Sequence, residues 1–456
     1  MPTTPREVAV VNTGDTAWIL TSAALVLLMT PGLALFYGGM VRAKSVLNMM
    51  MMSFGALALI SVLWVLYGYS MAFGDDVGGG LLGDPLEFFG LAGLMEDTTG
   101  EAGGMPVMAF VGFQAVFAIL TVALISGAIA DRAKFGSWMV FAGVWATIVY
   151  FPVAHWVFAF DGDDVVGGWI ANQLEAIDFA GGTAVHINAG AAGLALALVL
   201  GTRRGFGREA MRPHNLPLVM IGAGLLWFGW FGFNAGSALA ADNTAAVVWV
   251  NTLVATGAAI LGWLLVERIR DGHSTSLGAA SGVVAGLVAI TPACSSLSPV
   301  GSIVVGAVAG VLCALAVGLK YRFGYDDSLD VVGVHLVGGL WGTVAVGLLA
   351  DPDAPAGAES LVFGGSADLL WRQVVGAAAV LAFSFAVTWV IGTVIQKTIG
   401  FRIGEDEEIT GIDTVVHAES GYDLASLGSG ATAPSTGQAR ATSTEGTARS
   451  TERTMA

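Results

Sequence analysis

The chain has 456 residues, of which 55% are hydrophobic and only 12% are charged, and its formal net charge is −16. A soluble globular protein carries about 25% charged residues, so the composition excludes an ordinary soluble domain and predicts a protein that crosses a membrane many times. The 64 glycines fit this class, because small residues let membrane helices approach closely.

The charge composition is acidic, and only four of the nineteen basic residues are lysine. An acid-rich, lysine-poor chain is typical of salt-loving organisms, and on this basis we predict a halophilic archaeal source. An acidic surface without environmental meaning is the alternative interpretation. The two cysteines, Cys294 and Cys313, indicate neither a disulfide framework nor a metal site. We predict no cofactor and no nucleic-acid partner.

The chain begins with a polar stretch, residues 1–16, without a basic region leading into a short apolar core, so we expect no signal peptide. Eleven apolar segments follow, each near the ~20 residues that span a bilayer. We predict that they are helices, because backbone groups in hydrocarbon must be satisfied within their own segment. The segments cover residues 17–38, 47–73, 105–130, 137–159, 179–200, 215–238, 244–266, 277–293, 301–319, 331–350 and 372–396.

The charges of the loops predict the orientation. If the N-terminus lies outside, seventeen of the nineteen basic residues fall on the inner side, and only Arg6 and Arg372 fall outside. Basic residues concentrate in cytoplasmic loops. An error of one helix would scramble this asymmetry, so the charges support eleven spans.

An odd number of spans divides naturally into five, five and one. We predict an all-α polytopic membrane protein in which two halves of opposite orientation form an inverted repeat, a plan found in many transporters, followed by one further helix. The expected parts are an extracellular segment 1–16, the two halves 17–200 and 201–350, an outer loop with the last span 351–397, a cytosolic regulatory segment 398–422, and a disordered tail 423–456, which has too few large apolar residues to form a core.

Two histidines lie within apolar stretches and have similar surroundings. His186 and His335 both fit the pattern Val-His-aliphatic-x-small-Gly-x-x-Gly, and Asp178 and Asp327 stand eight residues upstream of them. Ionisable side chains within membrane segments usually have a function. We predict that both rings belong to one site, where they share a proton as a pair. Two separate packing histidines are the alternative. For Asp178 we expect mainly helix capping.

Aromatic residues of the third and sixth segments suggest a cation site near the outer side. Trp230, Phe233 and Ser237 share one helical face, and Phe113 and Phe117 stand one turn apart. Aromatic faces attract a small cation, and a hydroxyl accepts a hydrogen bond from it. The alternative is that these rings pack the core or form an interfacial belt.

These residues and the strings around them closely resemble the ammonium transporters of the Amt/Mep/Rh superfamily, Amt branch. The resemblance covers roughly residues 15–422 in the order that the family requires. The strings that carry it are Gln114 to Phe135, Phe151 to Trp156, Asp178 to Asn188, Pro213 to Pro217, Trp230 to Ser237, Thr291 to Cys294 and Val332 to His335.

The resemblance implies a role for each candidate residue. His186 and His335 would form the twin-histidine conduction path, and Phe117 and Phe233 would close the pore above it. The outer ammonium recruitment site would contain Phe113, Trp230, Ser237 and Phe158, shaped by Asp178, and the remaining pore-lining candidates are Thr291 and Asn234.

One position departs from the family pattern. Many bacterial members have tryptophan where this chain has Phe158, and Trp156, two residues away, points to a different helical face. Phenylalanine is the weaker cation–π partner, so we expect weaker ammonium binding at the outer site than in those members.

The resemblance also implies partners and location. The strings from Arg402 to Glu405 and from Gly411 to Glu419 follow the family's cytosolic C-terminal motif. A homotrimer in the plasma membrane is expected, with a cytosolic PII signal protein as partner and ammonium or ammonia, and methylammonium, as substrates.

The function expected is ammonium uptake rather than an enzymatic reaction: ammonium is recruited outside, loses its proton, and crosses as ammonia, while the proton travels separately along the imidazoles. Three alternatives stay open. The pore could conduct neutral ammonia without net charge, the protein could be a nitrogen sensor with incidental flux, or the two histidines could bind haem.

Overall fold

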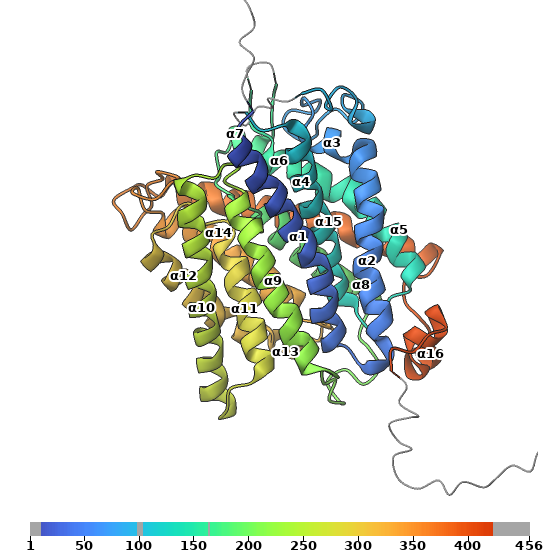
Figure 1. Ribbon diagram of the computed structural model, residues 1–456. Helices are drawn as coiled ribbons and strands as arrows, with labels where there is room; N and C mark the ends of the chain where they lie inside the picture. Colours follow the sequence, from blue (N-terminus) through green and yellow to red (C-terminus); the bar gives the residue numbers. More distant parts are fainter. Residues whose placement is uncertain (1–10, 98–103, 163–164, 423–456) are drawn as a thin grey trace, which may run out of the picture. The chain divides into compact units, whose positions relative to one another are not determined.

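The computed structural model describes residues 11–97, 104–162 and 165–422. It divides the chain into two units, Met1–Gly421 and Tyr422–Ala456, and the tail predicted to be disordered lies outside the described residues. In the described ranges every regular element is helical, apart from two isolated β-bridges. The elements (Figure 1) are α1 (Thr13–Met40), η1 (Ala43–Ser45), α2 (Val46–Leu63), η2 (Trp64–Gly68), α3 (Tyr69–Phe73), η3 (Phe89–Leu91), α4 (Val107–Ile125), η4 (Ser126–Ile129), α5 (Phe135–Trp145), η5 (Ala146–Tyr150), α6 (Phe151–Phe158), α7 (Trp169–Asn172), η6 (Gly182–Ile187), α8 (Asn188–Leu200), α9 (Leu216–Gly236), α10 (Asn243–Asp271), α11 (Ser276–Ile290), α12 (Pro299–Ala316), α13 (Leu319–Phe323), η7 (Val332–Leu336), α14 (Val337–Leu349), α15 (Asp368–Thr398), α16 (Glu405–Thr410) and η8 (Asp413–His417).

Ten helices of the described chain are long and apolar enough to cross a membrane, and they coincide with ten of the eleven predicted segments. The eighth predicted segment, 277–293, forms α11, which has only 15 residues, so the count of eleven is not confirmed. The helix ends at Ile290 because Pro292, two residues later, has no N–H with which to continue it. α11 is buried along most of its length between its neighbours.

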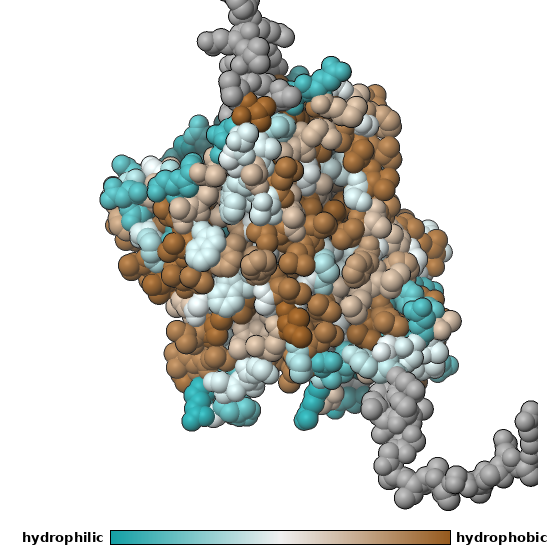
Figure 2. All heavy atoms as spheres, in the orientation of Figure 1, coloured by the Kyte–Doolittle hydropathy of each residue, from teal (hydrophilic) through white to brown (hydrophobic). Residues whose placement is uncertain are grey.

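The surface has the pattern expected of a protein in a bilayer. On the face shown in Figure 2, hydrophobic side chains cover the middle, and hydrophilic ones gather towards the two ends. Leu261 and Val300 are 71% and 70% exposed, which would be costly in water and is favourable in lipid. Together with the ten apolar helices, this surface identifies a multi-pass membrane protein.

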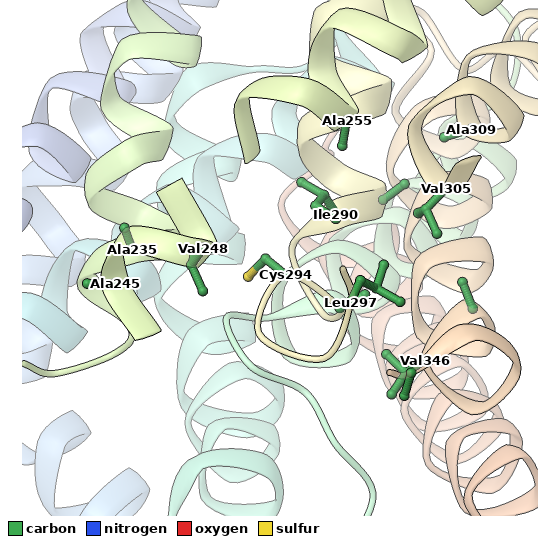
Figure 3. Packing of buried hydrophobic residues seen from close by; sticks show 14 residues of the cluster. Ala235, Ala245, Val248, Ala255, Ile290, Cys294, Leu297, Val305, Ala309 and Val346 are labelled. Atoms are coloured by element: carbon green, nitrogen blue, oxygen red, sulfur yellow. The ribbon is translucent and has the colours of Figure 1, made fainter. Parts of the chain in front are cut away.

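Small residues bring the helices into close contact. Gly306 and Gly310 of α12 face α10 so tightly that an added Cβ would lie 2.0 Å from the Ala255 carbonyl oxygen and 2.1 Å from that of Ala259. Figure 3 shows the neighbouring buried cluster, which draws side chains from α10, α11, the turn after it, α12 and α14: Val248, Ile290, Leu297, Val305 and Val346. This packing holds the second half of the chain together.

Replacing Gly310 with alanine should therefore destabilise the protein. The new methyl group would push α12 away from Ala259, and overpacking of this kind costs about 1–3 kcal/mol. Thermal unfolding of the purified protein in detergent measures the loss. Gly257→Ala is the matched control on α10, because its Cβ would meet nothing within 4 Å. A Gly310→Ala melting temperature equal to that of the control would contradict the packing argument.

Candidate functional site

Each predicted pore histidine lies in a short π-helical turn that an aspartate caps. Asp178 Oδ1 accepts hydrogen bonds from the N–H groups of Gly181 (2.8 Å) and Gly182 (2.6 Å), and its Oδ2 accepts one from that of Thr183 (2.7 Å). The Asp327 carboxylate accepts bonds from the N–H groups of Val331 (3.0 Å) and Val332 (2.7 Å). These bonds satisfy backbone donors that have no partner at a helix start.

The turns themselves are equivalent in the two halves. His186 is the fifth residue of η6, and His335 is the fourth of η7. A π-helical turn carries an extra residue relative to the α-helix and occurs frequently at functional sites. The same turn after the same kind of cap in both halves is what an inverted repeat requires.

The glycine four residues after each histidine lets the two turns meet. A Cβ on Gly190 would lie 2.5 Å from the Leu336 backbone nitrogen. On Gly339 it would lie 3.1 Å from both the His186 Cβ and the Gly182 carbonyl oxygen. Each glycine therefore accommodates the histidine-bearing turn of the other half, which gives the repeated sequence pattern a physical reason.

The two imidazole rings face one another. Their Nδ1 atoms are 3.3 Å apart, the ring centroids are 5.3 Å apart, and the ring planes differ by 26°. His186 is fully buried and His335 is 3% exposed. A hydrogen bond between two Nδ1 atoms needs one donor and one acceptor, so at least one ring is neutral. The direct contact leaves no space for a haem iron between the rings.

Aromatic rings continue from the histidines towards the N-terminal end of α4 and the C-terminal end of α9, the predicted outer side. Phe233 stacks on Phe117 with centroids 4.1 Å apart and planes 25° from parallel, and Phe113 meets Phe117 edge-on at 4.9 Å. The Phe233 ring also lies 6.1 Å from His186. We call this stacked pair the phenylalanine gate, after its predicted role.

Trp230 lies at the level of the histidines. Its ring stacks on His186 with centroids 5.4 Å apart, and its Nε1 donates a hydrogen bond to Thr291 Oγ1 (2.9 Å). The Thr291 hydroxyl is 3.2 Å from Asn234 Oδ1, so the three predicted residues form one buried polar chain. Ser237 is two turns further along α9, about 10 Å away. That Trp230 belongs to the outer ammonium recruitment site stays a prediction.

Ser237 and Phe113 lie at the C-terminal end of α9. The Ser237 hydroxyl donates to the Phe233 carbonyl (2.8 Å) and keeps its lone pairs for another donor. An added Cβ on neighbouring Gly236 would lie 2.9 Å from the Phe113 ring. Phe158 is half-buried at the last position of α6. Trp156 bonds to the Leu81 carbonyl and packs against Phe383, so it does not take the place of the missing tryptophan.

The opposite ends of the helices, on the predicted inner side, carry a buried charge cluster that sequence reasoning missed. Arg203 binds Asp326 through two nitrogens (2.8 and 2.9 Å) and Asp131 through a third (3.0 Å). Burial raises the pKa of Asp326, but Arg203 and Arg132 outweigh it and hold the pKa below its ordinary value. Burial lowers the pKa of Arg132 to about 10. The sequence signal that could have revealed this cluster is the pair Asp131 and Arg132, which directly follows an apolar segment.

The predicted regulatory segment packs against this region. The Glu408 carboxylate is almost completely buried, lies 3.1 Å from Arg402 and 3.5 Å from Arg42, and accepts a bond from the Arg204 N–H (2.9 Å). Asp413 accepts bonds from two N–H groups at the start of α2. The segment is therefore fixed to the inner ends of both halves.

Because both oxygens of the Asp178 carboxylate cap the start of η6, we expect the protein to lose stability when Asp178 is replaced with alanine. Removing a capping side chain costs about 0.5–2 kcal/mol, and here several backbone donors lose their acceptor at once. Thermal unfolding in detergent should show the lower melting temperature. Asp353→Ala, a change in an exposed outer loop, is the control. Equal stability of the two variants would show that the cap contributes nothing.

Comparisons with known proteins identify the family. A model of the Ammonium Transporter Family matches residues 17–422. An ammonium transporter of Mycobacterium tuberculosis is 61% identical over 442 residues, 92% of each chain, and one of Bacillus subtilis is 48% identical, covering 90% of this chain and 98% of its own. The crystal structure of Saccharomyces cerevisiae Mep2 matches with a TM-score of 0.79 and 34% identity over 87% of this chain and 88% of its own. A structure titled "Sensor Amt Protein" has a TM-score of 0.81 and 27% identity over 88% and 98%. The comparisons do not bear out the predicted halophilic archaeal source, because relatives come from bacteria and archaea alike. The chain belongs to the Ammonium Transporter Family.

Proposed function

We propose that the protein transports ammonium by separating it into ammonia and a proton. The observation that carries this proposal is the imidazole pair, with Nδ1 atoms 3.3 Å apart, enclosed beneath the stacked rings of Phe117 and Phe233. A second observation is the unpartnered Nε2 atom of His186, which is buried. A buried polar atom without a partner is costly, and a passing ammonia molecule would supply one.

Selectivity follows from the chemistry of the substrate. Ammonium and potassium have similar size and charge, and both lose their hydration on entering hydrocarbon, which is costly for an ion. Ammonium alone can donate hydrogen bonds and give up a proton. The Ser237 hydroxyl and the nearby rings recruit the cation, and the phenylalanine gate admits only the dehydrated substrate. Ammonia then crosses beside the histidines.

The proton travels along the imidazole pair in this proposal. A hydrogen bond between the two Nδ1 atoms connects the outer half of the path with the inner half, so a proton that enters on one ring can leave from the other. Net transfer of one charge makes uptake electrogenic. The membrane potential then assists it by about 2.3 kcal/mol per 100 mV.

The assembly and partners are part of the same proposal. The chain forms a homotrimer in the plasma membrane with its N-terminus outside. The seventeen basic residues on the inner side support this orientation. The inner face, including the fixed segment from Arg402 to His417, receives a cytosolic PII signal protein. Methylammonium is a further substrate.

Replacing His186 with alanine should abolish most of the ammonium-driven current. The substitution removes one half of the proton path while the rest of the helix packing stays. Solid-supported membrane electrophysiology on proteoliposomes measures the current after an ammonium pulse, and His335→Ala should behave in the same way. His273→Ala, in the exposed turn between α10 and α11, should keep the full current. Wild-type current with unchanged selectivity over potassium in His186→Ala would reject the proposed role.

The same recording distinguishes the alternatives. A wild-type protein that passes ammonia without any current would be an electroneutral ammonia channel. The solved structure titled "Sensor Amt Protein" keeps a sensor function in view. In that case neither current nor ammonia flux would exceed that of empty liposomes by more than a trace.

Replacing Phe158 with tryptophan should strengthen binding at the outer site. A better cation–π partner adds about 0.5–1 kcal/mol at a partly exposed position, which lowers the half-saturating ammonium concentration about two- to fivefold. The concentration dependence of the current measures it. Phe160→Trp is the matched control, because Phe160 is 66% exposed two residues further on. A shift no larger than that of the control would remove Phe158 from the site.

A further inference from the structure

The last long helix, α15, follows the two predicted halves and contacts both of them. It packs against α5 and α8 of the first half and against α14 of the second (Figure 1). An added Cβ on Gly347 of α14 would overlap the Leu370 Cα, and one on Gly392 of α15 would lie 2.7 Å from Leu196 Cδ2. Because α8 continues η6 and α14 continues η7, α15 touches the helix that extends from each histidine turn.

α15 carries a buried glutamine, Gln373, whose carbonyl oxygen and both N–H donors are hydrogen-bonded. Its Oε1 accepts a bond from the Ile177 N–H (2.6 Å), and its Nε2 donates to the carbonyls of Ile177 (2.7 Å) and Thr343 (3.2 Å). The side chain has no exposed surface. A buried amide is costly unless its groups are paired, so this side chain holds the backbone groups that it binds in fixed positions.

The two segments that Gln373 joins are those that carry the histidine turns. Ile177 directly precedes Asp178, whose carboxylate caps η6. Thr343 lies on α14, which continues the second turn, and its Oγ1 would be 2.9 Å from a Cβ on Gly182, the first residue of η6. One amide therefore links the start of the first histidine turn to the helix that follows the second.

A second polar residue of α15 binds the other end of the same turn. Ser384 lies about three helical turns beyond Gln373, on the same side of α15. It is fully buried, and its hydroxyl donates to the Asn188 carbonyl at 2.8 Å. Asn188 directly follows η6. The helix α15 therefore binds the backbone on both sides of His186.

The contact between the histidine rings needs this support. The Nδ1 atoms of His186 and His335 are 3.3 Å apart, near the long end of the hydrogen-bonding range, so a further separation of a few tenths of an ångström removes the bond. A π-helical turn is rare and occurs mostly as a single turn at functional sites. The ring on such a turn keeps its position only if both ends of the turn are held.

We propose that Gln373 is a positioning residue for the proton path. It fixes the backbone before η6 relative to α14 and so keeps His186 within hydrogen-bonding distance of His335, and Ser384 is the second point of attachment. This inference rests on the proposed function, in which a proton crosses from one ring to the other. It also gives a role to the helix that follows the two halves.

The variant Gln373→Met tests the proposal, because methionine has a similar length but replaces none of the three hydrogen bonds. The direct measurement is a solid-state NMR correlation between the Nδ1 nuclei of His186 and His335, recorded on protein with isotope-labelled histidine in liposomes. The wild type should give this correlation, and the variant His335→Ala identifies the signal by removing it. We expect the correlation to be lost in Gln373→Met.

The ammonium-driven current separates positioning from binding. In Gln373→Met the maximal current per folded protein should fall on the order of tenfold, because a misplacement of about 1 Å is enough for such a loss. The half-saturating ammonium concentration should stay that of the wild type, because Ser237 and Phe113 are unchanged. Ser384→Ala is a smaller change and remains a valid test if Gln373→Met fails to fold. It should weaken both the correlation and the current.

Thr388→Val is the matched control. Thr388 lies one turn beyond Ser384 on α15, is fully buried, and accepts a hydrogen bond from Trp145 Nε1 of α5 at 2.8 Å. The substitution thus also removes a buried hydrogen bond of α15, but one that does not involve the backbone of η6, α8 or α14. It should lower the melting temperature and leave the correlation and the current per folded protein unchanged.

The outcomes are distinguishable from a failure of the proposed function. If Gln373→Met keeps the correlation, or if Thr388→Val loses it to the same extent, Gln373 has only a structural role and the inference is overturned. If the wild type gives the correlation and Gln373→Met loses it, but the wild type carries no current, Gln373 positions the rings and the proposed proton path is wrong. A wild type without the correlation overturns both.

Discussion

The contact between two imidazole nitrogens is the interaction on which the rest of the structure depends. In hydrocarbon an ionisable ring needs a partner, and the partner here comes from the other half of the chain. The hydrogen-bonding distance of 3.3 Å between the Nδ1 atoms of His186 and His335 ties η6 to η7 and fixes how the two halves are related. The aspartate caps, the glycines and the aromatic rings surround this pair.

Three features of the backbone make that contact feasible. The Asp178 and Asp327 carboxylates satisfy the exposed N–H groups where the two turns begin. The π-helical turns set the rotation of the rings about the helix axis. Glycines such as Gly190 allow the opposing turn to approach within a distance that any side chain would block. Because each feature occurs in both halves, the site has an approximate internal symmetry, although its two ends differ in chemistry.

In the proposed scheme, the different chemistry of the two ends gives the path a direction. At the outer side Phe233, Phe117 and Phe113 present aromatic faces, which attract a cation and repel water. At the predicted inner side Asp330 and Lys320 form a partly exposed ion pair, and Glu408 joins the predicted regulatory segment to Arg42 and to the Arg204 N–H. In the proposed scheme, an apolar entrance and a charged exit suit a substrate that arrives as a cation and crosses as a neutral base with a separate proton.

The sequence by itself determined the membrane class, the position of ten spans, and the two equivalent histidine motifs, because hydropathy, loop charge and repeated strings are local properties of the chain. The family resemblance then predicted roles for residues such as Phe117 and Ser237. Only the tertiary structure decided that Trp230 stacks on His186, that Thr291 bonds to the indole, that α11 is a short buried helix, and that Gln373 binds both Ile177 and Thr343. Those facts depend on how the helices rotate and approach one another. The close packing at glycines and the extra residue in each π-helical turn set this geometry. It joins residues that are far apart in the sequence, so no local sequence pattern reveals it.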